Sequence, residues 1–332
     1  MGLNAPNMRR LNQEYLTMVR DLLVLIELAP ESLSRLEAAG FKAHVAFSTE
    51  AKAITLKSMG PQIQAVLTNG STGLSADEMA SLPQLKIICA QGAGYEKVDL
   101  VAARARDIVV THGPGTNDAS VADHAIALLM AIVRGIPQAD AAVRHGQWAH
   151  SRQPRPMLSK KKLGILGLGN IGQQIARRGV GGFEMSVGYH SRHPRHDSPF
   201  TYFDTPVALA SWADFLIVAT PGGAGTFHLV DATVLKALGP DGYLVNIARG
   251  SVVDTAALIS ALTNREIAGA ALDVVEGEPE VPAAFANLNN LILTPHIAGR
   301  SPEAVTATLQ LVIENLTAYF SGSPVLTPVP WV

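Results

Sequence analysis

The sequence predicts an α/β protein built from two doubly wound parallel sheets. Short runs rich in Val, Ile and Leu recur along the chain with helical stretches between them, which is the pattern of buried parallel strands joined by crossover helices. A glycine motif at Gly167 to Gly172 divides these runs into an earlier and a later series. The chain has 332 residues, which is enough for one domain per series.

The earlier series contains five predicted strands with helical stretches between them. Glu31 to Ala39 is one of these stretches. The predicted strands are 21–28, 43–47, 63–68, 85–90 and 108–111.

Two helices are predicted to link the series. Ser120 to Arg134 is apolar on most faces, and Pro137 to Trp148 follows after Gly135. Arg152 to Pro156 contains two prolines and predicts a loop that leads into the next strand.

The later series starts with the strand that enters the glycine motif and ends before a last helix. Pro302 to Tyr319 has helical periodicity and could cross back to complete the first domain, which places the domains at 1–112 with 299–332 and at 113–298. Two crossings of the chain predict a hinge. The strands after the motif are 185–189, 215–219, 243–247, 270–274 and 291–293.

The glycine motif is the strongest local indication of a ligand. A strand runs directly into G-x-G-x-x-G and then into a helix, which is the context that makes this motif a dinucleotide site. Gly167 allows the tight turn, Gly169 lets the backbone approach the pyrophosphate, and Gly172 permits close packing of helix and strand. The predicted contacts are Gly167, Leu168, Gly169, Asn170, Ile171 and Gly172.

The end of the second strand of this domain favours NADP. No acidic residue stands there to bind the ribose 2′-hydroxyl of NAD. Arg192 can instead pair with a 2′-phosphate, Ser191 can add a hydroxyl hydrogen bond, and Arg195 a second positive charge. The alternative is a solvated basic loop.

Composition excludes several classes of function. The net charge of −2 and the pI near 6.6 provide no basic surface for nucleic acid or an anionic membrane, so neither is expected as a partner. The single cysteine, Cys89, leaves no internal disulfide and no cysteine-rich zinc site; no metal is expected, and Cys89 is interpreted as a small buried hydrophobe. The first residues lack a secretory signal and are expected to form a loose or helical extension; no apolar run approaches the length of a membrane span. We expect a cytoplasmic protein.

Several motifs in one order resemble the D-isomer-specific 2-hydroxyacid dehydrogenase family over nearly the whole chain after its first twenty residues. Within the family, Ser191-Arg192, the run Glu278 to Pro282 and the ending Phe320 to Pro328 are similar to NADPH-dependent hydroxypyruvate and glyoxylate reductases. The family motifs are Gln91 to Asp99, Val121 to Ala125, Gly167 to Gly172, Asn246 to Gly250, Leu272 to Pro279 and Thr294 to Ile297.

Residue chemistry independently supports reduction of a 2-oxoacid. That reaction needs a cation for the carboxylate, a proton donor for the carbonyl oxygen, and a group that tunes the donor. Arg249 follows a strand end and has the planar fork for a carboxylate; His296 is the side chain suited to donate a proton near neutral pH. Glu278 would pair with His296, fix its tautomer and favour the imidazolium. The resemblance gives these three residues the same roles.

The resemblance implies further contacts and an arrangement. It implies a Rossmann-type nucleotide domain and a flavodoxin-like substrate domain, with the active site in the cleft between them. Ala93 and Gly94 match the loop whose backbone N–H groups hold the substrate carboxylate, together with Arg249 and His296. Further matches to cofactor contacts are Thr116, Thr220, Pro221, Ala248 and Asp273, the last beside the nicotinamide.

Departures and alternatives accompany this interpretation. Asp123 replaces a glutamate common in the family, and Gly222-Gly223 replaces a bulkier stretch, which predicts a more flexible loop. A 2-ketogluconate reductase would use the same catalytic trio, and a nucleotide-sensing corepressor of the same fold would be non-catalytic. A homodimer is implied, although the apolar faces of Ala125 to Val133 could equally be internal core.

Overall fold

The computed structural model describes residues 19–149 and 151–330, so the predicted amino-terminal extension lies outside the described residues. By its internal contacts the chain forms two compact units. Unit 1 is Met1–Asn117 with Pro302–Val332, and unit 2 is Asp118–Ser301. The chain passes from one unit to the other at 117–118 and at 301–302. The boundaries expected from the sequence are a few residues earlier, at 112–113 and 298–299.

Unit 1 contains a five-stranded parallel sheet in the order β2-β1-β3-β4-β5. This is the order of flavodoxin-like sheets and confirms the fold class implied for this part of the chain. Cys89 in β4 is buried, and burial raises the pKa of its thiol to about 12, which suits a packing residue rather than a nucleophile. The strands are β1 Arg20–Val24, β2 Phe41–Val45, β3 Ala65–Asn69, β4 Ile87–Gln91 and β5 Val109–Thr111.

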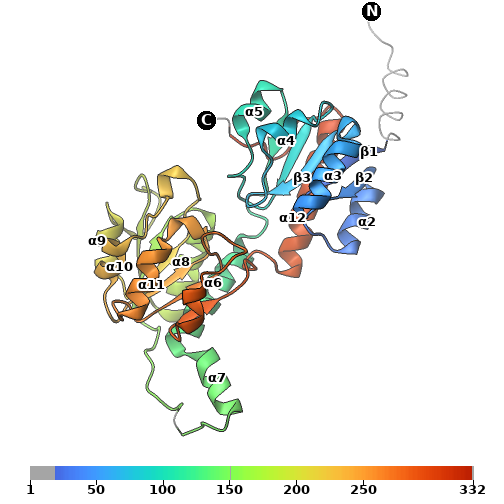
Figure 1. Ribbon diagram of the computed structural model, residues 1–332. Coiled ribbons are helices and arrows are strands. Elements are labelled where there is room, and N and C mark those ends of the chain that lie inside the picture. Colours follow the sequence, from blue (N-terminus) through green and yellow to red (C-terminus); the bar gives the residue numbers. More distant parts are fainter. Residues whose placement is uncertain (1–18, 150, 331–332) are drawn as a thin grey trace, which may run out of the picture. The chain divides into compact units, whose positions relative to one another are not determined.

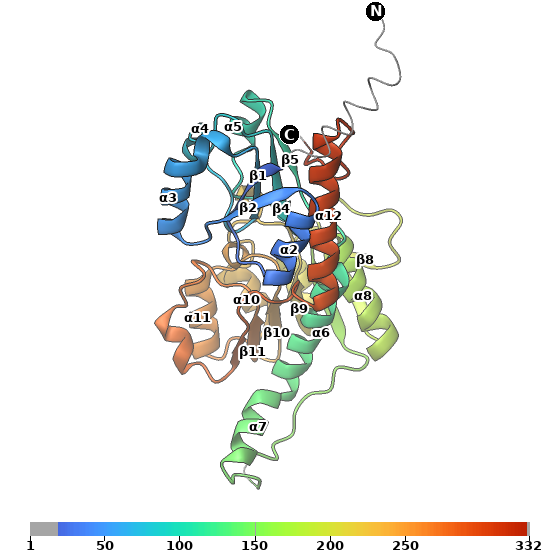
Figure 2. The ribbon, with the colours of Figure 1, turned by 90° about the vertical axis from the view of Figure 1, so that its right-hand side faces the viewer.

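Helices cover both faces of this sheet because successive strand residues point to opposite sides. Leu22 and Val24 belong to one core cluster with side chains of α2 (Pro30–Ala38) and α12 (Pro302–Phe320). Leu23 belongs to the opposite cluster, with side chains of α3, α4 and α5. Helix α12, red in Figures 1 and 2, packs against β4 although some 200 residues separate them in sequence. The other helices are α3 Thr49–Met59, the 3-10 turn Gly60–Gln62, α4 Ala76–Ala80 and α5 Leu100–Ala105.

Unit 2 contains a seven-stranded parallel sheet in the order β12-β11-β10-β9-β6-β7-β8. The strand order reverses between β6 and β9, which is the position where doubly wound sheets bind nucleotides. This sheet confirms the predicted Rossmann-type fold. The strands are β6 Lys162–Leu166, β7 Ser186–His190, β8 Thr201–Tyr202, β9 Phe215–Val218, β10 Tyr243–Asn246, β11 Gly269–Leu272 and β12 Leu291–Leu293.

Two layers of helices bury the faces of this second sheet. Helix α6 (Asp118–Arg134) and α8 (Asn170–Phe183) share a core cluster with one face. Three helices and two 3-10 turns contribute side chains to the core of the other face. They are α9 Pro206–Trp212, α10 Ala232–Leu238, α11 Thr255–Thr263 and the turns Gly250–Val252 and Ala283–Asn287. A further 3-10 turn is Ala224–Thr226.

Helix α6 and the segment after it differ from each other in burial. Ala125, Leu129 and Val133 are fully buried inside unit 2, so this face of α6 is internal core, one of the two alternatives that the sequence left open. Helix α7 (Ile136–Arg144) ends earlier than the predicted Trp148 and has no buried residue. In both views α7 extends away from the sheet of unit 2 (Figures 1 and 2). Among the described residues no single helix could span a membrane; only α6 and α7 taken as a bent pair have the length and composition.

Candidate active site

The glycine motif forms the turn between β6 and α8. Gly167 has a φ of 96°, and a Cβ there would lie 2.7 Å from the carbonyl oxygen of Ala219. A Cβ at Gly172 would lie 2.1 Å from the Gly167 carbonyl oxygen. Both positions therefore require glycine, as the close turn and the close packing of helix on strand predict.

The start of α8 is left open to a ligand. No side chain caps it, since the N-cap is Gly169, and a Cβ at Gly169 would meet nothing within 4 Å. A helix N-terminus with exposed N–H groups attracts phosphate. Across the turn, the hydroxyl of Thr220 is buried without a hydrogen-bond partner in the described part of the chain. An open helix end, glycines that permit close approach and a spare buried hydroxyl fit a dinucleotide.

The predicted 2′-phosphate residues follow the end of β7, but they are not equally available. Arg192 is exposed and makes no hydrogen bond or ion pair among residues 19–149 and 151–330. Arg195 instead donates to both carboxylate oxygens of Asp197 (3.3 and 3.2 Å) and to the carbonyl oxygen of Leu168 in the glycine motif (3.1 Å). The hydroxyl of Ser191 donates to the carbonyl oxygen of His193 (2.7 Å). Arg192 is thus the cation best placed to receive a new anion.

His296 and Glu278 form the pair that the sequence predicts. Nδ1 of His296 lies 2.6 Å from Oε1 of Glu278. Burial would raise the pKa of Glu278, but the hydrogen bond and charge of His296, the backbone N–H of Val275 and the charge of Arg249 together lower it below its ordinary value. An ionised carboxylate only accepts, so Nδ1 of His296 is the donor and Nε2 is left for other partners.

Arg249 follows β10 and sits on a turn that Asn246 shapes. The side-chain amide of Asn246 donates to the carbonyl oxygen of Arg249 (3.0 Å), and its oxygen accepts from the backbone N–H of Ala248 (3.0 Å). A guanidinium nitrogen of Arg249 donates to the Ala248 carbonyl oxygen (2.7 Å). The charge of Arg249 acts on Glu278. The charges of His296 and Arg249 therefore both act on the Glu278 carboxyl.

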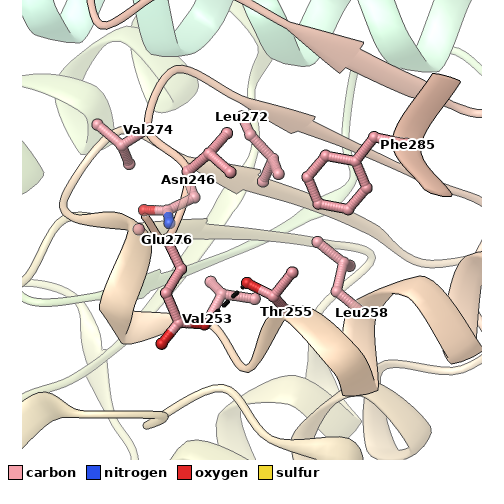
Figure 3. A pocket seen from close by; sticks show the side chains of 10 residues that line it. Asn246, Val253, Thr255, Leu258, Leu272, Val274, Glu276 and Phe285 are labelled. Atoms are coloured by element: carbon pink, nitrogen blue, oxygen red, sulfur yellow. Dashed lines mark hydrogen bonds between the residues drawn. The ribbon is translucent and has the colours of Figure 1, made fainter. Parts of the chain in front are cut away.

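The backbones that carry Arg249 and Glu278 touch each other. A Cβ at Gly250 would lie 2.1 Å from the carbonyl carbon of Val275, so only glycine allows this approach. Glu276 fastens the same two segments: its carboxylate accepts from Thr255 Oγ1 (2.9 Å) and contacts His228 Nε2 (2.9 Å). Figure 3 shows Glu276 and Thr255 at a small pocket that also contains Leu258 and Phe285. This pocket does not include Arg249, Glu278 or His296. The sequence did not single out Glu276, although this residue lies within the family motif Leu272 to Pro279.

Asp273 organises the loop on which His296 stands. It is 2% exposed, and its carboxylate accepts from the backbone N–H groups of Ile297 and Ala298 (2.9 Å each) and from Thr294 Oγ1 (2.6 Å). Its carbonyl oxygen accepts from the N–H of His296 (2.8 Å). The backbone of His296 has a φ of 54°, in the left-handed region that few residues other than glycine adopt, and these bonds hold it there. In this structure the Asp273 carboxylate binds the loop, the capping role that residue type alone also allows.

Ala93, Gly94 and Thr116, which the sequence predicts as further contacts, belong to unit 1. The N–H groups of Ala93 and Gly94 make no hydrogen bond within the described chain, as a carboxylate-binding loop requires, while the Ala93 carbonyl oxygen contacts His112 Nδ1 (3.0 Å). Thr116 Oγ1 donates to the Gly113 carbonyl oxygen (3.0 Å), and the Pro221 carbonyl oxygen accepts from Thr226 (2.8 Å).

Comparison with known proteins decides the family. The family model of the D-isomer specific 2-hydroxyacid dehydrogenase NAD binding domain matches residues 126–298, more than half of the chain and most of unit 2. The protein belongs to this family. As a member it is an oxidoreductase that acts on CH–OH groups with a nicotinamide cofactor.

Relatives of this dehydrogenase differ in the substrate that they reduce. The chain is 43% identical over 310 residues to 2-ketogluconate reductase of Gluconobacter oxydans, covering 93% of this chain and 98% of that one. It is 40% identical over 279 residues to glyoxylate/hydroxypyruvate reductase A of Arabidopsis thaliana, covering 84% and 89%. The structure of an NADPH-dependent glyoxylate/hydroxypyruvate reductase of Sinorhizobium meliloti, in complex with NADP and malonate, matches with a TM-score of 0.86 and 40% identity over 94% of this chain and 97% of that one.

Proposed function

We propose that this dehydrogenase reduces small 2-oxoacids, glyoxylate and hydroxypyruvate, to D-2-hydroxyacids with NADPH. The observation that carries the proposal is the 2.6 Å contact between His296 Nδ1 and Glu278, with the charge of Arg249 acting on the same carboxylate. A histidine held by an ionised acid, next to a cation, is the set of groups that ketoacid reduction needs.

The three side chains divide the work. Arg249 orients the substrate carboxylate and polarises the carbonyl, since its guanidinium presents parallel donors. His296 holds a proton on Nε2 and delivers it to the carbonyl oxygen, which becomes the hydroxyl. Glu278 accepts from Nδ1, which keeps the ring oriented and stabilises the imidazolium. A nicotinamide bound at the glycine motif would supply the hydride to the carbonyl carbon.

Preference for NADPH over NADH is part of the proposal. It is supported by Arg192, an exposed cation at the end of β7 with no partner in the described part of the chain. It is also supported by the Sinorhizobium meliloti structure, which is a complex with NADP. A guanidinium recognises a 2′-phosphate with paired hydrogen bonds, and NADH has no 2′-phosphate.

Reduction of 2-ketogluconate is the second candidate. It is favoured by the Gluconobacter oxydans relative, which matches over 98% of its own length. The chain also has glycines at 222, 223 and 225; Gly223 has a φ of 119°, and a Cβ at Gly223 or Gly225 would meet nothing within 4 Å. A loop without side chains at these positions leaves room for a longer sugar acid.

The test is a panel of glyoxylate, hydroxypyruvate and 2-ketogluconate, each with NADPH and with NADH. The highest kcat/KM identifies the substrate class and the cofactor. His296→Ala should lower the reduction rate by roughly 10² to 10⁴, as removal of a general acid does, while fluorescence titration with NADPH stays near the parent value. His145→Ala is the control, because His145 is exposed and its ring contacts a carbonyl oxygen of the neighbouring helix α7.

The panel can also contradict the proposal. If the parent protein oxidises NADPH with none of the three acids but binds it tightly, a nucleotide-sensing role replaces the enzymatic one. If His296→Ala keeps the parent rate within a few fold, another acid donates the proton. We further propose that the protein is cytoplasmic and that it forms a homodimer through the exposed Ile136 and Val143 of α7. Light scattering of the parent and of Val143→Asp tests the dimer.

A further inference from the structure

The His296 loop is held by a helix as well as by Asp273. Helix α6 presents two polar side chains, four residues apart and so on one face, to the loop after β12. Ser120 Oγ donates to the carbonyl oxygen of Ala298 (2.6 Å). His124 Nε2 lies 3.0 Å from Thr294 Oγ1 and 3.4 Å from Asp273 Oδ1. These contacts bracket His296 on both sides in the sequence.

Counting hydrogens fixes which atoms donate in this network. Both carboxylate oxygens of Asp273 accept hydrogen bonds from backbone N–H groups, Oδ1 from Ile297 and Oδ2 from Ala298. Thr294 Oγ1 has a single hydrogen, and its 2.6 Å contact with Asp273 Oδ1 uses it. Thr294 therefore has only a lone pair to offer His124. The hydrogen between them belongs to Nε2 of His124, which acts as a donor.

We propose that His124 is a positioning residue for the reaction. Its Nε2–H holds Thr294, Thr294 holds the Asp273 carboxylate, and that carboxylate holds the N–H groups of the two residues after His296. The side chain of His124 is 21% exposed and that of Asp273 is 1% exposed, so water competes little for these bonds. The proposal rests on the proposed function, because that function gives His296 its role.

The main experiment compares three substitutions of His124. Glutamine places an amide nitrogen at nearly the same reach as Nε2, asparagine is one bond shorter, and leucine has no donor. His124→Gln should keep kcat near the parent value. His124→Asn and His124→Leu should lower kcat by roughly tenfold to a hundredfold, the effect of misplacing a reacting group by about 1 Å, with little change in affinity for NADPH. His145→Leu, at the residue that follows α7, serves as the matched control.

A second readout does not require activity. Hydrogen–deuterium exchange of the peptide covering residues 294–301 should be faster in His124→Leu and Thr294→Val, and near the parent rate in His124→Gln and Thr294→Ser. If the parent reduces no 2-oxoacid, the proposed function fails, and this exchange pattern still tests the positioning. Equal kcat and equal exchange for glutamine, asparagine and leucine would overturn the proposal. So would equal losses of kcat, NADPH affinity and melting temperature in all three, since a purely structural role gives that result.

Discussion

Glu278 is bound from two directions, and both contacts favour its ionised form. Oε1 accepts from His296 (2.6 Å), and Oε2 accepts from the backbone N–H of Val275 (3.3 Å). Burial opposes ionisation, yet the net pKa of Glu278 is below its ordinary value of 4.5. The carboxyl of Glu278 is therefore ionised at neutral pH, where it can accept the hydrogen bond of His296.

Glu278→Gln should change the pH dependence of ketoacid reduction. A neutral amide stabilises the imidazolium of His296 less than a carboxylate does, so the alkaline limit of kcat should move to lower pH. The measurement is kcat for the best substrate between pH 5 and pH 9. An alkaline limit at the parent pH would remove Glu278 from this role.

Stability provides a second check on the same residue. A carboxyl whose pKa is lowered by folding stabilises the protein above its unfolded-state value of 4.5 and loses that contribution as pH falls through the lower folded-state value. The difference in unfolding free energy between the parent and Glu278→Gln should therefore be largest at neutral pH and shrink below about pH 4.5. Urea titrations at pH 7 and at pH 3.5 measure it; a constant difference would show that the charge plays no part.

Arg192→Ala should shift the cofactor preference toward NADH. A charged hydrogen bond to phosphate is worth about 1.5 to 3 kcal/mol, so the NADPH/NADH ratio of kcat/KM should fall roughly tenfold or more. Arg177→Ala is the matched control, because Arg177 is also exposed and its loss changes the net charge equally. If the parent itself uses NADPH and NADH equally, the assignment of Arg192 is wrong.

Residue chemistry predicted the His296 and Glu278 contact but not the support around it. A proton donor and an acid can be recognised by type and by their position after strands. The roles of His124 and Glu276 depend on which helix faces which loop: His124 is 170 residues from Thr294, and Glu276 is 48 from His228. Residue type and spacing alone do not show such pairings.

At the scale of elements, strand prediction succeeded where burial is complete. Phe215–Val218 is buried at every position, and the predicted 215–219 overlaps it almost fully. The two-residue edge strand β8 was missed because it is too short for a pattern. Helix α3 was not predicted either; it contains no buried residue, so it has no apolar stripe to recognise.

Two glycines of helix α8 should respond oppositely to alanine. Gly172→Ala places a Cβ 2.1 Å from the Gly167 carbonyl oxygen and should destabilise the protein by about 1–3 kcal/mol while weakening NADPH binding. Gly181→Ala meets nothing within 4 Å and should stabilise it by about 0.4–1 kcal/mol. Denaturant titration of both variants gives the two values. A neutral Gly172→Ala would mean that the turn relaxes without cost.

At the scale of the whole molecule, the order of the strands in the sheet determines which predicted site residues come together, and composition does not show this. In the nucleotide sheet β6, β9 and β10 are neighbours. Gly167, Thr220 and the Arg249 turn follow these three strands and therefore lie at the same edge of the sheet. The sequence predicted both parallel sheets, because a strand, a helix and a further strand alternate along it. It could not give the register of the strands, which depends on cross-strand packing.

The ends of unit 2 meet each other, and so do the segments of unit 1 beside them. Ser120 Oγ accepts from the N–H of Ser301 (3.3 Å), and Thr308 Oγ1 donates to Thr116 Oγ1 (2.8 Å). Both core clusters of the nucleotide sheet consist of residues between 118 and 301. In architectural terms, a complete domain has been inserted into another at a single point.

An inserted domain of this kind should be separable and transplantable. The fragment 118–301, expressed alone, should fold cooperatively and bind NADPH, since its sheet, its glycine motif and its closing contacts are all internal. Circular dichroism on heating and NADPH fluorescence measure this, and a fragment that melts without a transition would contradict it. The remainder, with a short linker from 117 to 302, becomes a small flavodoxin-like scaffold into which another nucleotide domain with adjacent termini could be grafted.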